Sequence, residues 1–204
     1  GRHSKDQATI DQLIVAAALA GRRVLRLKGG DPSIFGRSIE ELVACAAHGI
    51  PVHICPGITA ASAAAASGLV SLTLRGAARQ LTFLTAHARG DEPLDVDWSR
   101  LASPDATLAI YMGRAAAPEV ARQLIGAGLR PDTPVMVAVN VSRPDERLLR
   151  GRLDALAFLV RTIGQDDPTL LLIGEALAGH AISRMATVAC DQVHQDAALA
   201  SGTR

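Results

Sequence analysis

Aromatic residues are the scarcest part of this 204-residue sequence, in which Phe, Trp and Tyr together make up only 2%. Because 49% of the residues are nevertheless hydrophobic, we expect a core built from Ala, Val, Leu and Ile. The length allows one large domain or two small ones. The formal net charge is only +1, which argues against bulk binding to nucleic acid or to an anionic membrane surface.

Cysteines and long apolar runs are also few. Cys45, Cys55 and Cys190 are odd in number and lack C-x-x-C spacing, so we expect no disulfide framework, no zinc site and a reducing compartment. No apolar run approaches the ~20 residues that a membrane-spanning helix needs. No signal peptide is visible at Gly1, and a cytoplasmic location is therefore the default expectation.

The sequence does contain an alternation of helical and strand patterns. This alternation predicts an α/β fold with largely parallel sheets. Ser38 and Glu41 have the spacing of a helix capping box. The predicted helices cover 6–19, 38–47, an alanine-rich stretch ending at 68, 118–125 and 153–163. The predicted strands cover 24–27, 52–55, 81–85, 108–112, 135–139 and 170–173.

The stretch VLRLKGGDPSIFG, residues 24–36, is the most informative part of the chain. An apolar run that ends in glycines predicts a buried strand that breaks into a turn. In open α/β sheets, ligands bind just outside the carboxyl ends of such strands. Gly29 and Gly30 allow the backbone to approach a ligand closely, and Pro32 stiffens the turn. Taken alone, the stretch fits a ligand site and an ordinary strand-to-helix turn about equally.

Three blocks, KGGDPSIFGRSIEE, CPGITAASAAAASGL and LAIYMG, occur in the order and spacing of a known family. On these blocks, the chain from about Gly1 to about Gly179 resembles the tetrapyrrole methylases. The resemblance implies two α/β domains with a cofactor cleft between them, here 1–78 and 79–181, followed by a tail at 182–204. It also implies S-adenosylmethionine as the methyl donor, S-adenosylhomocysteine as its product, and no metal.

Within that family, the sequence is most similar to the enzymes that C-methylate uroporphyrinogen III. The resemblance implies methyl transfer to C2 and C7 of this tetrapyrrole by a homodimer, giving precorrin-2 for sirohaem, cobalamin or haem d1. In the family, a segment with an aspartate and a lysine for acid–base work precedes the position that matches Gly1. We therefore expect this chain to lack the N-terminal part, so that this acid–base pair is not carried over to any residue from Gly1 onward.

Several alternatives to this function stay open. One is another precorrin methyltransferase of the same fold, and another is the diphthine synthase branch of the family, which methylates a protein. A non-catalytic truncated binding module is an alternative from a different class. A flavodoxin-like nucleotide binder is a more distant one.

The resemblance also assigns a set of cofactor-binding positions. Three of them have a simpler structural alternative: Asp31 as a turn cap, Thr59 as a helix N-cap and Met112 as core filler. Many relatives have an Asn-Gly pair where this chain reads Asn140-Val141, so we do not carry that backbone contact over. The assigned residues are Gly29, Gly30, Asp31, Ile34, Thr59, Ala60, Met112 and Thr169.

Arginines near the same cleft are the candidates for substrate binding, because uroporphyrinogen III carries several carboxylates. Arg37 and Glu40 lie one helical turn apart directly after the glycine turn, and Arg75 ends the segment LTLR. We expect Arg37 and Arg75 to bind carboxylates. Glu40 is the candidate catalytic residue, binding a pyrrole N–H or handling a proton. The alternative for Arg37 and Glu40 is a surface ion pair, and His3 and His87 are further titratable candidates near the rim.

Overall fold

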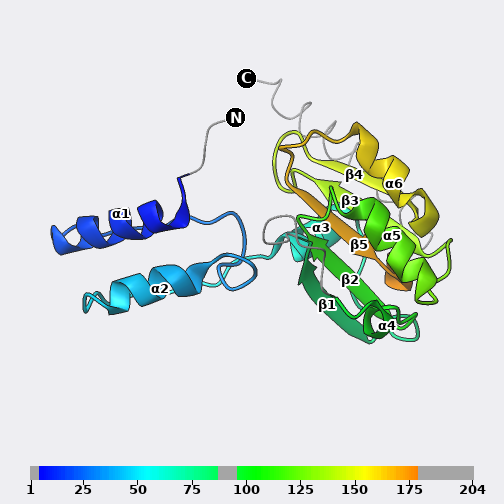
Figure 1. Cartoon of the computed structure of the whole chain (residues 1–204), viewed down its shortest axis with the longest axis horizontal. Helices are drawn as coiled ribbons and strands as arrows, with labels where there is room; N and C mark the ends of the chain where they lie inside the picture. The colour runs from blue at the N-terminus through cyan, green and yellow to red at the C-terminus, as the bar shows by residue number, and fades with distance from the viewer. Residues whose placement is uncertain (1–4, 87–95, 179–204) are drawn as a thin grey trace, which may run out of the picture.

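A five-stranded sheet forms the main body of the computed structural model, which describes residues 5–86 and 96–178. The strand order is β1-β2-β5-β3-β4 (Figure 1). Only β1 and β2 pair in parallel, whereas β5 runs antiparallel to both of its neighbours and β4 runs antiparallel to β3. The prediction of a largely parallel sheet is therefore wrong. The strands are β1 (Gln80–Thr85), β2 (Ala106–Tyr111), β3 (Pro134–Val139), β4 (Arg147–Arg152) and β5 (Thr169–Ile173).

Four helices begin and end close to the positions predicted from the sequence, whereas the short helix at Trp98–Leu101 was not predicted. Asp6 precedes the first helix and its carboxylate accepts a hydrogen bond from the Thr9 N–H at 2.8 Å. The predicted helix at 153–163 is instead a run of three short pieces. The helices are α1 (Gln7–Leu19), α2 (Ser38–Ala46), α3 (Ala60–Ser67), α4 (Trp98–Leu101), α5 (Ala117–Gly126) and α6 (Leu156–Leu159), with 3-10 turns η1 (Leu153–Ala155), η2 (Val160–Thr162) and η3 (Glu175–Leu177).

The sheet is covered by apolar side chains on both faces, as period-two alternation along the strands requires. On one face, Leu108, Ile110 and Val137 pack with residues of α5 and α6. On the other face, Ala109 and Met136 pack with residues of α3. No aromatic side chain is among the buried hydrophobic residues of the described part, which confirms the expected aliphatic core.

Helices α1 and α2 pack side by side, away from the sheet (Figure 1). The segments that join them to the rest include the predicted strands at 24–27 and 52–55, but neither segment is a strand in the structure. Leu25 and Leu27 are 88% and 81% exposed. A strand needs a neighbour for its backbone hydrogen bonds, and no described residue pairs with either segment. These two predictions are therefore wrong for the described structure.

Two further points concern the helices. The predicted capping box of α2 is wrong, because Ser38 donates its hydroxyl to the Pro32 carbonyl at 2.8 Å and Glu41 is buried in ion pairs. No helix in the described ranges is long and apolar enough to cross a membrane.

Candidate functional site

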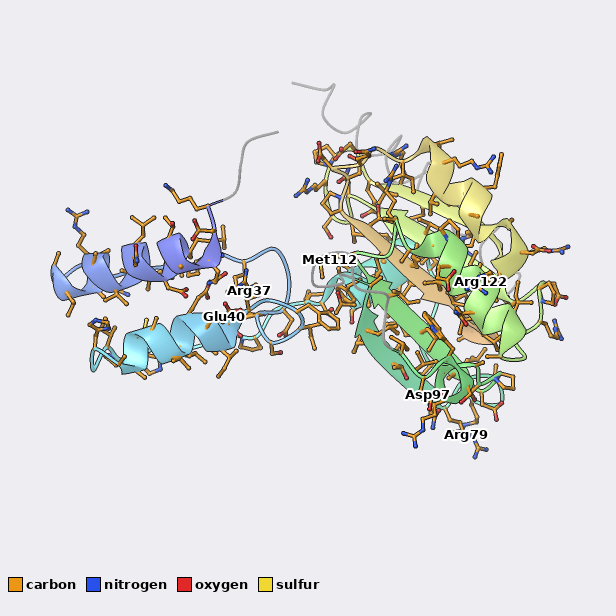
Figure 2. The ribbon with its side chains drawn as sticks, in the orientation of Figure 1. Arg37, Glu40, Arg79, Asp97, Met112 and Arg122 are labelled. Atoms are coloured by element: carbon orange, nitrogen blue, oxygen red, sulfur yellow. The ribbon has the colours of Figure 1, made fainter. Side chains whose placement is uncertain are left out.

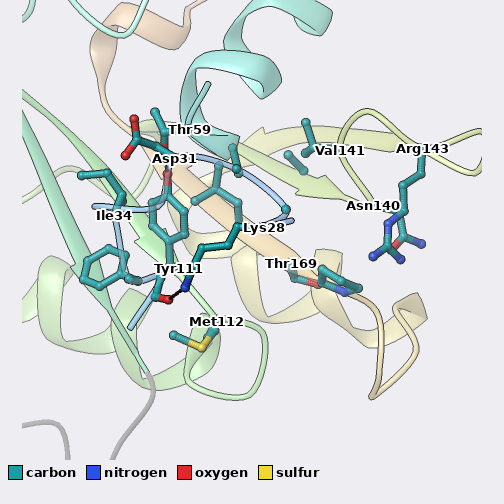
Figure 3. A pocket seen from close by; sticks show the side chains of 18 of the residues that line it. Lys28, Asp31, Ile34, Thr59, Tyr111, Met112, Asn140, Val141, Arg143 and Thr169 are labelled. Atoms are coloured by element: carbon teal, nitrogen blue, oxygen red, sulfur yellow. Dashed lines mark hydrogen bonds between the residues drawn. The ribbon is translucent and has the colours of Figure 1, made fainter. Parts of the chain in front are cut away.

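A cavity of about 440 Å³ lies where the glycine turn, the start of α3 and the ends of β2, β3 and β5 meet (Figure 3). All eight residues assigned to the cofactor from the sequence line it. They come from separate blocks of the chain, which the fold brings together. They are Gly29, Gly30, Asp31, Ile34, Thr59, Ala60, Met112 and Thr169.

The glycine turn and the Pro-Gly turn are in backbone contact at one wall of the cavity. A Cβ on Gly57 would lie 2.4 Å from the carbonyl oxygen of Gly30, so only glycine fits there. The Asp31 carboxylate joins the two turns, since it accepts hydrogen bonds from the Ser33 N–H at 2.8 Å and the Gly57 N–H at 3.3 Å. Hydrogen bonds from the Ser33 hydroxyl and backbone, and then from Gly57, lower the pKa of Asp31. Asp31 is thus both a turn cap and a residue of the cavity wall.

The start of α3 is held by a tyrosine that the sequence reading did not single out. Thr59 occupies the N-cap position, as its structural alternative expected, but its hydroxyl makes no capping bond to the helix backbone, so the expected bond is wrong. The Tyr111 hydroxyl instead accepts a hydrogen bond from the Ala61 N–H at 3.2 Å and shares a second one with the Thr59 hydroxyl. The end of β2 therefore fixes the position of Thr59 and Ala60 in the cavity wall.

A buried carboxylate orders the cations beside the glycine turn. Glu41 of α2 is 8% exposed and pairs with Lys28 at 2.9 Å and Arg26 at 3.1 Å. Burial by itself would raise the pKa of Glu41, but hydrogen bonds from Lys28 and Gln7 and the charges of Lys28 and Arg26 lower it overall. Lys28 also donates to the Gly36 carbonyl, and both cations line the cavity. The sequence contains these three charged residues, but its pattern does not predict that they come together in the fold.

The far wall is built on the ends of β3 and β5. Asn140 is 4% exposed and its amide nitrogen donates to Asp145 at 2.7 Å, while its backbone N–H donates to the Pro168 carbonyl at 3.0 Å. Among the described side chains, its Oδ1 is a buried atom without a hydrogen-bond partner. Asn140 and Met112 both have positive φ, 52° and 54°, a conformation that concentrates at functional sites when non-glycine residues adopt it.

The three residues assigned to the substrate lie elsewhere. Arg37 and Glu40 form a bidentate ion pair, with contacts of 2.7 and 2.6 Å, on the exposed start of α2 (Figure 2). Arg75 is exposed in the turn before β1. None of the three lines the cavity. The contacts of Arg37 and Glu40 are those of the surface ion pair weighed as the alternative. The roles of these residues toward a substrate stay predictions.

The cavity suits a ligand with polar, apolar and charged parts. The glycine turn exposes backbone groups, Ile34 and Met112 supply apolar contacts, and Lys28 and Arg143 supply positive charge. No group of three or more His, Cys, Asp or Glu side chains within the described ranges is placed to hold a metal ion.

Some of the sequence predictions fall on residues that the structure does not describe. Gly1, before which the family resemblance puts the acid–base segment, lies outside the described residues. The expectation that this segment is missing from the chain therefore stays a prediction, and so does the catalytic role of Glu40. His3, His87 and Cys190, and the predicted tail, also lie outside the described residues.

Comparison with known proteins agrees with this arrangement. The model of the Tetrapyrrole (Corrin/Porphyrin) Methylases matches residues 1–157, and the chain belongs to this family. A solved neighbour, uroporphyrin-III C-methyl transferase from Thermus thermophilus complexed with S-adenyl homocysteine, is 33% identical with a TM-score of 0.70, over 84% of this chain and 74% of that one. A cobalt precorrin-4 methyltransferase is 27% identical with a TM-score of 0.78, over 87% of this chain and 74% of that one.

Curated relatives are longer than this chain. A siroheme synthase from Gluconacetobacter diazotrophicus is 46% identical over 176 residues, which is 86% of this chain but 37% of that protein. A uroporphyrinogen-III C-methyltransferase from Paracoccus denitrificans is 44% identical over 178 residues, or 87% of this chain and 62% of that one. The chain thus spans little more than a third of the siroheme synthase.

Proposed function

We propose that this chain is part of a methyltransferase that uses S-adenosylmethionine to methylate C2 and C7 of uroporphyrinogen III, giving precorrin-2. The observation that carries the proposal is the cavity in which all eight residues assigned to the cofactor meet. The names of the Paracoccus and Thermus relatives, at 44% and 33% identity, support this substrate. We also propose a homodimer in the cytoplasm, with two domains at 1–78 and 79–181, of which the described part of 1–78 contributes helices and turns but no strand.

The cofactor fits the cavity on structural grounds. Its amino-acid and ribose groups need hydrogen-bond partners, which the exposed backbone at Gly29–Asp31 provides. Its adenosine needs an apolar wall, which Ile34 and Met112 provide. The close contact between Gly57 and Gly30 keeps the turn backbone at the cavity surface.

The chemistry that the cofactor supplies is a methyl group on a positively charged sulfur, ready for transfer to an electron-rich pyrrole carbon. The residues of this chain bind the donor and fix its orientation, and positioning alone lowers the barrier of such a two-reactant step substantially. Lys28 and Arg143 place positive charge on the cavity wall, and this charge suits the carboxylates of a tetrapyrrole or of the cofactor.

A second candidate is another precorrin methyltransferase. The higher TM-score of the cobalt precorrin-4 methyltransferase, 0.78 against 0.70, favours it, whereas the higher identity of the Thermus enzyme, 33% against 27%, favours uroporphyrinogen III.

Two measurements test the proposal in sequence. First, calorimetric titration of the chain with S-adenosylhomocysteine should show one saturable site, and no binding would overturn the cofactor assignment. Second, the full-length natural protein is incubated anaerobically with uroporphyrinogen III and S-adenosylmethionine, and the tetrapyrrole is analysed by mass spectrometry. Addition of two methyl groups supports precorrin-2 as product. No addition to uroporphyrinogen III, with methylation of a later precorrin, would support the second candidate instead.

A further inference from the structure

Three of the scarce aromatic residues of the chain meet at the side of the cavity. The chain has only three phenylalanines, one tyrosine and one tryptophan, yet Tyr111 packs against two of the phenylalanines. Its ring centroid lies 5.0 Å from that of Phe35 in the glycine turn and 6.1 Å from that of Phe83 in β1. One side chain at the end of β2 therefore contacts both the sheet and the turn before α2.

The hydroxyl of Tyr111 adds a third connection, to the first turn of α3. The first N–H groups of any helix have no partner within the helix, and an N-cap side chain normally satisfies one of them. Here the Thr59 hydroxyl does not do so, and the Ala61 N–H donates to Tyr111 instead, at 3.2 Å. The cap of α3 thus comes from a residue 50 positions further along the chain.

A second bond of the Tyr111 hydroxyl, to the Thr59 hydroxyl, ties the tyrosine to the wall of the cavity. A phenol has one proton to donate, and the oxygen of Tyr111 already accepts from Ala61. Either hydroxyl can donate in the bond to Thr59, because the phenol oxygen has a second lone pair beside the one that accepts from Ala61. In either direction the bond fixes the Thr59 side chain, which lines the cavity (Figure 3).

We infer that Tyr111 is a positioning residue for the bound cofactor. It holds Thr59 and Ala60 against the cavity, through its bonds to the Thr59 hydroxyl and the Ala61 N–H. This inference rests on the proposed function, because it takes the cavity to be the cofactor site. It assigns Tyr111 no contact with the reacting atoms.

The test compares the wild type with four variants by titration with S-adenosylhomocysteine. Tyr111→Phe keeps the ring contacts and removes only the hydroxyl, so affinity should fall about three- to tenfold, as expected for one neutral hydrogen bond. Thr59→Val should give a similar loss, and the double variant should lose little more than either single one, because both remove the same unit. Thr107→Val is the control, since it removes from the same strand a buried hydroxyl that has no hydrogen-bond partner among the described residues; its affinity should match the wild type.

A second readout needs no ligand. The amide hydrogen of Ala61 should exchange several-fold faster in Tyr111→Phe than in the wild type, while amides in the middle of β3 exchange at equal rates. Wild-type affinity in Tyr111→Phe, or additive losses in the double variant, would overturn the inference while leaving the proposed function intact. Failure of the wild type to bind S-adenosylhomocysteine would overturn the proposed function and with it the inference, and the Ala61 exchange rate would then still show whether Tyr111 caps the helix.

Discussion

Glu41 offers the sharpest test of how this chain holds its N-terminal helices. Its carboxylate lies between Lys28 and Arg26, and the side chains of Glu41 and Lys28 are only 10% and 12% exposed. The substitution Glu41→Gln keeps the shape of the side chain but replaces one acceptor oxygen with an NH₂ group. This group then faces Lys28 or Arg26, from which it cannot accept a hydrogen bond. Lys28 is then left nearly buried without a counter-charge, and this is the situation that makes broken buried pairs destabilising.

The magnitude follows from the exposure of the three groups. Removing one partner of a fully buried pair costs about 3–5 kcal/mol. Arg26 is 39% exposed, so water screens part of the cluster and the expected loss for Glu41→Gln is about 2 kcal/mol. That corresponds to amide exchange about 30-fold faster in the unit that opens. Because α1 and α2 pack mainly on each other, we expect this acceleration in their amides and not in the sheet.

The assay is amide hydrogen exchange with urea unfolding alongside it, and Glu40→Gln is the matched control. Glu40 precedes Glu41 on the same helix, but its ion pair with Arg37 is exposed, so its loss should change little. The depressed pKa of Glu41 adds a pH test. Its contribution is fully present above the ordinary pKa of a glutamate and is lost as the pH falls from there through the lowered pKa of the folded state; Glu41→Gln should lack this dependence. Equal acceleration in the two variants would refute the reasoning.

Two further predictions separate the cavity from its surroundings, each measured by S-adenosylhomocysteine titration. Gly57→Ala should weaken binding more than about tenfold, because the new Cβ would lie 2.4 Å from the Gly30 carbonyl oxygen. Gly126→Ala in α5, where a Cβ meets open space, should keep wild-type binding and gain about 0.5 kcal/mol in stability. Arg75→Ala and Arg37→Ala should leave cofactor affinity unchanged, because neither side chain lines the cavity. If they also leave turnover of uroporphyrinogen III by the full-length protein unchanged, their predicted substrate roles are wrong.

Helices α1 and α2 were predictable because local residues begin or end them. Asp6 caps α1 through the Thr9 N–H, and Gly21 and Gly49 follow their helices with positive φ of 74° and 65°. Strand β4, in contrast, escaped prediction because Arg-rich edge strands carry charge in place of an apolar alternation. The sequence pattern also could not predict the order of the strands, because β5 lies between β2 and β3 and is antiparallel to both.

Sequence motifs located the cofactor candidates because their glycines and small residues have a local conformational purpose. Gly57 is required by a close backbone approach that any side chain would prevent, and Gly30 has a positive φ of 154° that residues with side chains rarely adopt. Lys28 and Tyr111 were missed for the opposite reason. Their roles depend on partners far along the chain, such as Thr59, which is 52 positions from Tyr111.

The failures of local rules gather around the cavity, and this clustering itself supports a functional site there. Glu41 leaves its predicted capping box to hold two cations of the cavity wall, and Thr59 leaves its capping role to Tyr111. Met112 and Asn140 adopt positive φ at the ends of two strands whose central residues are fully regular and buried. A sequence selected for folding alone satisfies its local rules, whereas departures persist where a binding surface needs them. The same reasoning predicts that a change which lets the Thr59 hydroxyl cap the backbone of α3 would stabilise this helix and at the same time weaken cofactor binding.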